Sequence, residues 1–383
     1  MARKTLHIAL NGVTGRMGYR QHLVRSLLAI RDQGGVQLPD GTAVYPEPIL
    51  VGRSESKLAE IAQRHGITRW STSLDEVLSD LRVDVYFDAQ VTSAREASLA
   101  KAIAAGKHIY TEKPVAGSLD GALRLASAAR DAGITHGVVQ DKLFLPGMVK
   151  LRRLVRAGFF GRVLAARLEF GYWVFDGDLI AAQRPSWNYR AADGGGIVLD
   201  MFPHWQYLLE DLFGPVTAVY ARAATHLPER WDEAGTRYDA TADDAAYAVL
   251  EFGSGVFASV NSSWAVRVNR RELVELQVDG THGSAVAGLR HCAIQHRVST
   301  PLPVWNPDLP DPIDYRAQWT DVPDNEAFDN GFKAQWELFL AAVGRGEAFR
   351  WDLAEGARGV QLAELAQRSS DQGVRLTVPP LAI

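Results

Sequence analysis

The first 140 residues alternate between short apolar runs and longer segments with helical spacing, and no other feature constrains the fold as strongly. The apolar runs have the length of strands buried on both faces, as in a parallel sheet. The alternation predicts an α/β domain with a doubly wound parallel sheet over residues 1–140. Residues 31–47 are rich in Gly and Pro and are expected to form an inserted loop. The expected strands are Leu6–Leu10, Pro48–Gly52, Val83–Ala89, Lys107–Thr111 and Ile134–Val139, and the expected helices are Tyr19–Ile30, Ser54–His65, Ala94–Ala105 and Ser118–Ala132.

The rest of the chain has a different pattern, in which strand-like segments follow one another and helices are set apart from them. This pattern predicts an α+β domain with a large open, mostly antiparallel sheet over residues 141–383. The Pro-rich residues 301–312 are expected to form a surface loop. The expected helices are Pro146–Ala157, Leu199–Phe213, Phe332–Val343 and Leu353–Ser370, and the expected strands are Gly161–Trp173, Val216–Thr225, Ala245–Phe252, Val256–Ser262 and Glu272–Asp279.

Composition and charge exclude several classes of protein. The chain has 383 residues, a formal net charge of −4 and one cysteine. It lacks the basic surplus of a nucleic-acid-binding protein, and no apolar run approaches the roughly 20 residues of a membrane helix. Cys292 alone forms neither an internal disulfide nor a cysteine-based metal site. We therefore expect a cytoplasmic protein without a metal, a membrane span or a nucleic-acid partner.

A glycine-rich turn joins the first expected strand to the first expected helix. Three glycines recur at intervals of three residues, which differs from the commoner G-x-G-x-x-G spacing. At such a junction the first glycine permits a tight turn, the second admits a pyrophosphate to backbone N–H groups, and the third lets helix and strand pack closely. Three turn glycines without a ligand are the alternative, but the strand–turn–helix context favours bound NAD or NADP. The expected contacts in this turn are Gly12, Thr14, Gly15, Arg16, Met17 and Gly18.

The residues after the second expected strand bear on the choice between NAD and NADP. An acidic residue there would bind the ribose 2′-hydroxyl of NAD, whereas basic residues accommodate the 2′-phosphate of NADP. No acid follows this strand directly, and Arg53, Ser54 and Lys57 offer a guanidinium, a hydroxyl and an ammonium. Glu55 is a nearby competitor, and a helix N-terminus with solvated charges is the alternative interpretation. The pattern favours NADP and leaves NAD open.

Two further motifs place chemically useful side chains near the predicted cofactor edge. Lys113 lies in Thr111–Pro114, at the carboxyl end of an expected strand, where doubly wound sheets bind ligands. Asp200 and His204 follow the glycine run 194–196 and are four residues apart, so they share one helical face. A surface Glu–Lys pair, a capping aspartate and an ordinary helix histidine are the structural alternatives.

Together these motifs resemble the glucose–fructose oxidoreductase / inositol dehydrogenase / MocA family of NAD(P)-dependent oxidoreductases. The resemblance runs almost end to end and rests on the glycine turn, Glu112-Lys113-Pro114, the glycine run with Asp200 and His204, and residues 243–264 and 357–378. It implies a dinucleotide-binding domain followed by a substrate-binding domain that forms homodimers or homotetramers through its open sheet. It also implies a sugar, cyclitol or glycoside as substrate.

The resemblance implies a role for each polar residue of these motifs. Lys113 would lie beside the nicotinamide and donate a hydrogen bond to the substrate oxygen, and His204 would accept the hydroxyl proton as general base. Asp200 would fix the substrate or the imidazole. An imidazole suits proton transfer near neutral pH, and a neighbouring ammonium stabilises alkoxide charge and lowers the proton affinity of the imidazole. The remaining expected cofactor contacts are Gln90, Val91, Glu112 and Gln140.

This chain departs from the family pattern at two places. Residues 89–95 lack the family's usual Ala-Thr-Pro-Asn followed by His, so we expect a backbone contact to the cofactor there. After the strand that ends at residue 139, Asp141 and Lys142 stand where the family often has Asn and Arg. Lys142 indicates an unusual or anionic substrate, with a solvated turn residue as the alternative. Aromatic rings stack on sugar C–H faces, and the further expected substrate contacts are Tyr172, Trp173, Trp187, Tyr189 and Arg190, with Asp176 and Asp178 as additional candidates.

Three functions remain open at this point. A net oxidoreductase would transfer a hydride between the nicotinamide and a hydroxyl or carbonyl carbon of the substrate. A redox-assisted glycoside hydrolase, a role that some relatives adopt, would recycle tightly bound NAD through oxidation, elimination, water addition and re-reduction. A dinucleotide sensor without catalysis is the third, and the presence of Lys113, Asp200 and His204 argues against it.

Overall fold

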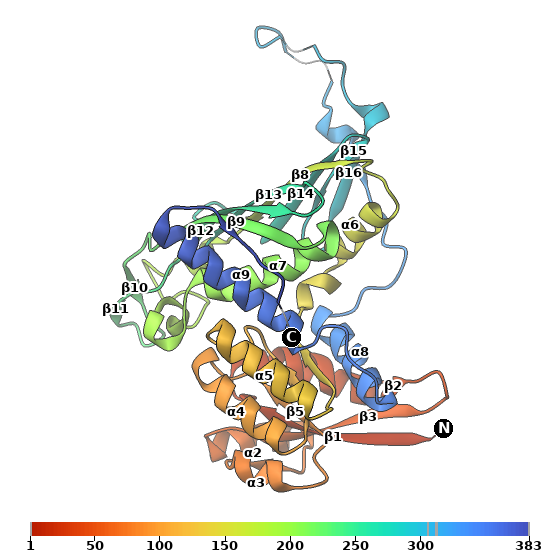
Figure 1. The fold of residues 1–383 in the computed structure, drawn as a ribbon, viewed down its shortest axis with the longest axis vertical. Coiled ribbons are helices and arrows are strands. Elements are labelled where there is room, and N and C mark those ends of the chain that lie inside the picture. The colour runs from red at the N-terminus through yellow and green to blue at the C-terminus, as the bar shows by residue number, and fades with distance from the viewer. Residues whose placement is uncertain (1, 305, 311–312, 382–383) are drawn as a thin grey trace.

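The computed structural model describes residues 2–304, 306–310 and 313–381. Within these residues the two halves of the chain form separate sheets, and helices α7 (Ile197–Phe213) and α9 (Leu353–Gln372) lie between them (Figure 1). The predicted fold class, a doubly wound parallel sheet followed by an α+β domain, is confirmed.

The N-terminal sheet has the strand order β2-β3-β1-β5-β6-β7 among the described residues, and β4 also pairs with β3. All of these pairs are parallel except β2–β3. The strands are β1 (Arg3–Asn11), β2 (Val36–Gln37), β3 (Ala43–Val51), β4 (Trp70–Ser71), β5 (Val85–Asp88), β6 (His108–Thr111) and β7 (His136–Val138). The helices are α2 (Glu55–His65), α3 (Leu74–Ser79), α4 (Thr92–Ala104) and α5 (Leu119–Asp131).

The expectation of an inserted loop over residues 31–47 is wrong for part of that segment. Strand β2 pairs antiparallel with the start of β3, which begins at Ala43, five residues before the apolar run suggested. Pro46 and Pro48 lie between the parts of β3 that pair with β2 and with β4, where that edge of the strand has no neighbour in the described sheet. A missing N–H is tolerated at an unpaired edge, so these prolines do not interrupt the strand.

The helix after the glycine turn is not the regular α-helix that the spacing of its apolar residues predicted. It is π-helical over Met17–Leu28 (η1) and α-helical only over Ala29–Asp32 (α1), whereas one regular helix was expected over residues 19–30. Segments of π-helix occur frequently at functional sites. Here η1 carries the completely buried His22, which reaches Glu112 after strand β6.

The C-terminal sheet has the order β17-β16-β15-β14-β8-β13-β12-β9-β18 among the described residues, and only the β8–β13 pair is parallel. Its strands are β8 (Val163–Phe170), β9 (Val216–Ala224), β12 (Ala245–Phe252), β13 (Phe257–Ser263), β14 (Val274–Gly280), β15 (Gly283–Ala287), β16 (Cys292–His296), β17 (Thr320–Asp321) and β18 (Leu376–Thr377). A separate hairpin pairs β10 (Glu229–Trp231) with β11 (Arg237–Asp239). The expected long strand 161–173 is too long, because the chain leaves the sheet after Phe170 and turns into a short 3₁₀ helix, η3 (Trp173–Phe175).

Two C-terminal helices connect the halves. Helix α8 (Gly331–Arg345) packs Trp336 and Phe339 into the core beside β1 and η1, although it follows the second sheet in sequence. Helix α9 packs Val360 against the N-terminal sheet and Ala366 into the core of the C-terminal domain. Helix α6 (Pro146–Arg156) flanks the C-terminal sheet. The edge of the first sheet at which Lys113 follows β6 is thereby held against the helix that carries Asp200 and His204.

Residues 301–304 and 306–310 project from the end of the C-terminal sheet (Figure 1). Their described apolar side chains, Leu302, Val304 and Leu309, are exposed, whereas residues 305, 311 and 312 lie outside the described residues. In the described part of the chain, no helix combines the length and the apolar character needed to cross a bilayer.

Candidate active site

The glycine turn closes over the carboxyl ends of β1 and β5. Gly12 has φ +84°, and a Cβ there would lie 2.7 Å from the backbone of Ala89, so no other residue fits without a shift. The N–H of Gly15 donates to Gly12 O over 3.0 Å and forms the tight turn. The outer side chains of the turn are exposed. They are Thr14, Arg16 and Met17.

The residues expected at the cofactor's second phosphate lie at the N-terminus of α2. Ser54 occupies the N-cap position, but its hydroxyl contacts Ser56 Oγ at 3.3 Å and does not cap the helix. Arg53 and Lys57 are exposed, and no ion pair within the described chain involves either of them. A helix N-terminus with two unpaired cations is suited to an anion.

The loop after β5 is tied to the segment after β6 by Arg95 of α4. The guanidinium is buried, donates to Asp88 Oδ1 over 3.1 Å and to Gln90 O over 2.6 Å, and also donates to the backbone oxygen of Pro114. These bonds fix Gln90 next to the Lys113–Pro114 segment. Sequence reasoning missed Arg95, whose contacts depend on two loops meeting.

Lys113 and Asp200 meet across the two halves of the chain. Lys113 Nζ lies 2.5 Å from Asp200 Oδ1 and also donates to Asp200 O over 3.0 Å. Arg184 Nη2 contacts the other carboxylate oxygen at 2.8 Å, and its guanidinium lies over the ring of Trp264. Burial alone would raise the pKa of Asp200, but the charges of Arg184 and Lys113 outweigh it and hold the pKa well below its usual range. Sequence reasoning missed Arg184, because a loop arginine carries no local signal.

His204 is buried and has hydrogen-bond partners on both ring nitrogens. Nδ1 lies 2.6 Å from Tyr207 Oη, which also accepts the N–H of Lys142 over 3.3 Å and donates to Asp141 Oδ1 over 3.4 Å. A Tyr207 hydroxyl that donates to Asp141 accepts from Nδ1–H, and in that tautomer Nε2 carries the lone pair. Tyr207 lies three residues after His204 on the same helical face, a spacing that would have identified it.

Lys142 completes this cluster. Its Nζ lies 3.3 Å from His204 Nε2 and 3.6 Å from Asp141 Oδ2. Burial lowers the pKa of His204 well below its usual value, and the charges of Lys142, Lys113 and Arg184 lower it further. Burial also lowers the pKa of Lys142, against the opposing charge of Asp141. The site therefore combines an imidazole of lowered pKa with the neighbouring cations Lys142, Lys113 and Arg184.

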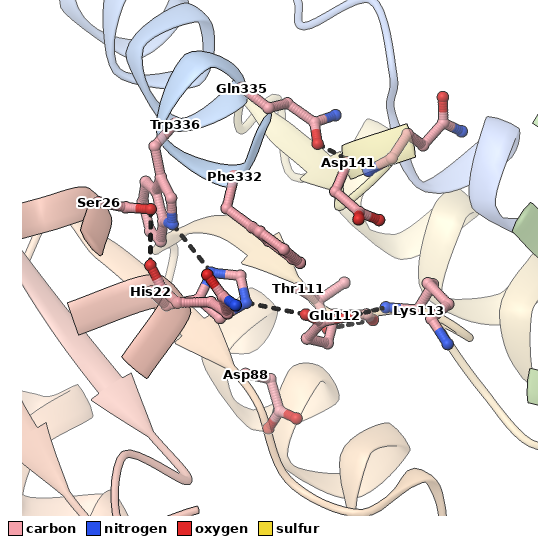
Figure 2. Close-up of polar contacts among 12 residues, drawn as sticks. His22, Ser26, Asp88, Thr111, Glu112, Lys113, Asp141, Phe332, Gln335 and Trp336 are labelled. Atoms are coloured by element: carbon pink, nitrogen blue, oxygen red, sulfur yellow. Dashed lines mark hydrogen bonds and ion pairs between the residues drawn. The ribbon is translucent and has the colours of Figure 1, made fainter. Parts of the chain in front are cut away.

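Glu112 and Gln140 are buried just after the carboxyl ends of β6 and β7. Glu112 Oε2 accepts the N–H of Lys113 over 3.2 Å, and Oε1 lies 2.8 Å from His22 Nε2 (Figure 2). The N–H of Gln140 donates to Gln335 Oε1 of helix α8 over 2.7 Å. Gln335 and His22 were not identified from the sequence, because their partners are far away in the chain.

The aromatic residues expected to bind substrate are not all equivalent. Tyr189 is completely buried; its hydroxyl donates to Phe175 O over 2.6 Å, and its ring packs against Arg230, so it is a core residue. Arg190 lies over the ring of Tyr238. Trp173 is exposed and packs beside Tyr172, and Trp187 is half-buried.

The remaining candidates are also accounted for. Asp176 and Asp178 both pair with Arg267 on the surface. The described residues contain no group of three or more His, Cys, Asp or Glu side chains that would hold a metal ion. The structure thus brings Lys113, Asp200, His204 and Lys142 together and leaves the aromatic residues at separate contacts.

Comparison with known proteins identifies the family. Residues 7–139 match the model of an oxidoreductase family with an NAD-binding Rossmann fold, and residues 148–286 match the GFO/IDH/MocA C-terminal domain. The chain is 59% identical over 382 residues to a D-xylose dehydrogenase from Paenarthrobacter nicotinovorans, an alignment that covers 99% of this chain and 98% of the relative. The chain belongs to the GFO/IDH/MocA family. The resemblance seen in the sequence is confirmed, and this family member is an oxidoreductase.

More distant relatives agree. A levoglucosan dehydrogenase from Pseudarthrobacter phenanthrenivorans is 26% identical over 243 residues, covering 60% of this chain and 61% of the relative. A solved structure of levoglucosan dehydrogenase in complex with NADH and L-sorbose superposes with a TM-score of 0.81 at 20% identity, covering 99% of this chain and 100% of that one. At that identity the superposition shows that this GFO/IDH/MocA protein shares the fold.

Proposed function

We propose that this protein is a dehydrogenase that oxidises a hydroxyl-bearing carbon of an aldose, with D-xylose as the first candidate. The observation that supports it most directly is that Lys113 contacts Asp200 and that its charge acts on His204, on a chain that is 59% identical to a D-xylose dehydrogenase along nearly its whole length. The free N-terminus of α2 and the glycine turn fit a dinucleotide. When bound, the nicotinamide supplies the hydride acceptor.

The protein's own residues orient the sugar and handle the proton. The Lys113 ammonium, held by Asp200, donates a hydrogen bond to the reacting oxygen and stabilises negative charge that develops on it. His204 Nε2, which Lys142 Nζ faces at 3.3 Å, carries the lone pair that accepts the hydroxyl proton. The low pKa of His204 keeps this lone pair available at neutral pH.

Once His204 has accepted the proton, the carboxylate of Asp141 favours the protonated imidazole. It lies 3.8 Å from His204 Nδ1 and is linked to it through Tyr207. Lys142 opposes the same state, because its ammonium faces Nε2. Lys142 thus limits how tightly the imidazole holds the proton, and its Nζ is the second cation available to a substrate oxygen. Trp173 and Trp187 are the proposed stacking surfaces for the sugar.

For the cofactor, we propose that the protein accepts NADP as well as NAD. Arg53 and Lys57 are exposed beside the free N-terminus of α2, where a 2′-phosphate would be bound. Replacing both with alanine is expected to weaken NADP⁺ binding about tenfold or more while leaving NAD⁺ binding within about twofold. Equal losses for the two dinucleotides would contradict this placement.

We also propose self-association through the outer face of the C-terminal sheet. Tyr220, Tyr247, Val249 and Phe257 are large exposed apolar side chains on neighbouring strands β9, β12 and β13. Such a contiguous patch is typical of a subunit interface. Light scattering is expected to give a dimer or tetramer, and a monomer at micromolar concentration would refute this proposal.

The function is tested by offering purified protein a panel of aldoses, polyols and glycosides with NAD⁺ or NADP⁺. Net formation of reduced nicotinamide with an aldose, lost in His204→Ala, is the expected result. Glycoside hydrolysis without net reduction of the cofactor would instead identify a redox-assisted hydrolase. Dinucleotide binding without turnover of any substrate would indicate a sensor.

A further inference from the structure

His22 connects the glycine-turn helix, the C-terminal helix α8 and the Glu-Lys-Pro motif. It is completely buried on η1, and its ring packs 4.3 Å from Phe87 and edge-on against Phe332 of α8. Figure 2 shows the imidazole between Trp336 and Glu112, with a contact on each ring nitrogen. Neither His22 nor Trp336 has a role in the mechanism above.

The partner of Nδ1 determines the protonation state of His22. Trp336 Nε1 donates to Nδ1 over 3.0 Å. An indole N–H is a donor only, so Nδ1 must keep its lone pair. The single hydrogen of the ring is therefore on Nε2, which donates to Glu112 Oε1 over 2.8 Å. A second proton on His22 would place two N–H groups against each other.

The consequence falls on Glu112. A protonated His22 would neutralise this carboxylate, whereas the neutral tautomer orients it and leaves its charge in place. Both carboxylate oxygens of Glu112 accept hydrogen bonds, from His22 Nε2–H and from the N–H of Lys113. Burial works to raise the pKa of Glu112, and the hydrogen bond from His22 and the charges of Lys113 and Arg95 work to lower it. The charged groups that act on Glu112 are Lys113 beside it, Arg95 from α4 and Lys142 from η2 (Asp141–Phe144). A negative charge therefore persists at the carboxyl end of β6.

We propose that Trp336 is a positioning residue that locks His22 in its neutral tautomer, and that Glu112, kept charged in this way, makes the site prefer oxidised over reduced nicotinamide. This inference rests on the proposed function, in which Lys113, the residue after Glu112, acts on the reacting oxygen beside the nicotinamide. The oxidised ring is a cation and the reduced ring is neutral. A carboxylate in a dry site attracts the former and has little effect on the latter.

The test compares the dissociation constants of NAD⁺ and NADH by fluorescence titration from pH 5.5 to 8.5. For the wild type, protonation of His22 is expected to make no contribution to the pH dependence of the ratio of these two dissociation constants. Trp336→Phe keeps an aromatic ring but removes the N–H, so His22 becomes free to protonate. The variant is expected to bind NAD⁺ about tenfold more weakly, relative to wild type, at pH 5.5 than at pH 8.5, with NADH binding unchanged. Glu112→Gln is expected to lose the preference for NAD⁺ at every pH.

The controls separate the possible failures. Phe339→Leu alters the same helix and aromatic core without touching His22, and it is expected to leave the pH dependence of the ratio as in wild type. A Trp336→Phe ratio that follows wild type at all pH values would overturn the tautomer lock, and an unchanged ratio in Glu112→Gln would overturn the role of the charge. If Trp336→Phe does not fold, ¹⁵N NMR of His22 in the wild type decides: protonation on Nδ1 contradicts the inference, and an Nε2–H ring that stays neutral at pH 5.5 supports it. Absence of NAD⁺ and NADH binding in the wild type would instead count against the proposed function.

Discussion

Replacing Tyr207 with phenylalanine tests whether the chain fixes the tautomer of its general base. The hydroxyl lies 2.6 Å from His204 Nδ1 and 3.4 Å from Asp141 Oδ1, and in the proposed tautomer it accepts Nδ1–H and donates to Asp141. Without it, Nδ1–H loses its acceptor in a buried site, and the proton is free to move to Nε2. Because Nε2 is the atom that takes the substrate proton in the proposed mechanism, each molecule in that second tautomer is inactive.

The hydrogen-bond geometry sets the size of the effect. Leaving a buried donor without a partner costs about 1–3 kcal/mol. Since roughly 1.4 kcal/mol corresponds to a factor of ten, kcat/KM is expected to fall about 5- to 150-fold. The affinity for the dinucleotide should change by less than about twofold, because Tyr207 contacts His204, Lys142 and Asp141 and none of the glycine-turn residues.

The assay is steady-state oxidation of D-xylose, or of the best sugar found, with the dinucleotide saturating. Tyr247→Phe is the matched control, because it removes a tyrosine hydroxyl whose contact among the described residues is with His226 on the exposed face of the C-terminal sheet, and it keeps the ring that the proposed subunit interface would use. The control should keep wild-type kinetics. A Tyr207→Phe enzyme within about twofold of wild-type kcat/KM would refute the tautomer argument.

Three more outcomes follow from the geometry. Lys142→Met removes a charge that lowers the pKa of His204, so the pKa of His204 is expected to rise. Activity needs the neutral imidazole, so as the pH is lowered the variant should lose kcat/KM at a higher pH than the wild type does. An acid limb of the kcat/KM profile that stays in place would contradict this. Arg184→Gln frees one oxygen of Asp200 and is expected to reduce kcat/KM about tenfold with little change in dinucleotide affinity, measured by kinetics and titration; an equal loss of NAD⁺ binding would show a different role. Arg230→Met leaves the completely buried Asp244 without its cation and should lower the free energy of unfolding by about 3–5 kcal/mol, measured by urea denaturation, and a loss below about 1 kcal/mol would show that the pair is dispensable.

Local signals in the sequence predict the elements that position the site. Ser118 begins one of the expected helices, and in the structure its hydroxyl accepts the N–H of Gly121 at the start of α5. The apolar runs locate β1, β5 and β6, because strands buried on both faces leave a continuous apolar pattern. Spacing along one helix also placed Asp200 and His204 on one face, and the structure brings Lys113 to the first of them.

Long-range contacts account for what the sequence does not reveal. Trp336 reaches His22 across 314 positions of sequence, and Arg184 meets Asp200 through an irregular loop. Neither pair has a periodicity that could be recognised. The prolines of β3 illustrate the same difficulty, because they are tolerated only where the neighbouring strands leave the edge of β3 unpaired. Tyr189 shows the converse: an aromatic residue in a promising loop is a core residue, since its hydroxyl finds a backbone partner inside the protein.

The most direct test of the account follows a deuterium atom from the sugar to the cofactor. D-xylose deuterated at each carbon in turn is incubated with the protein and oxidised dinucleotide, and the reduced dinucleotide is analysed by mass spectrometry. Transfer of deuterium to the nicotinamide from one carbon only, with a slower rate for that isotopologue, is the predicted result. Reduced dinucleotide without deuterium from any position, or hydrolysis with the label released to water, would contradict hydride transfer between an alcohol carbon and the nicotinamide.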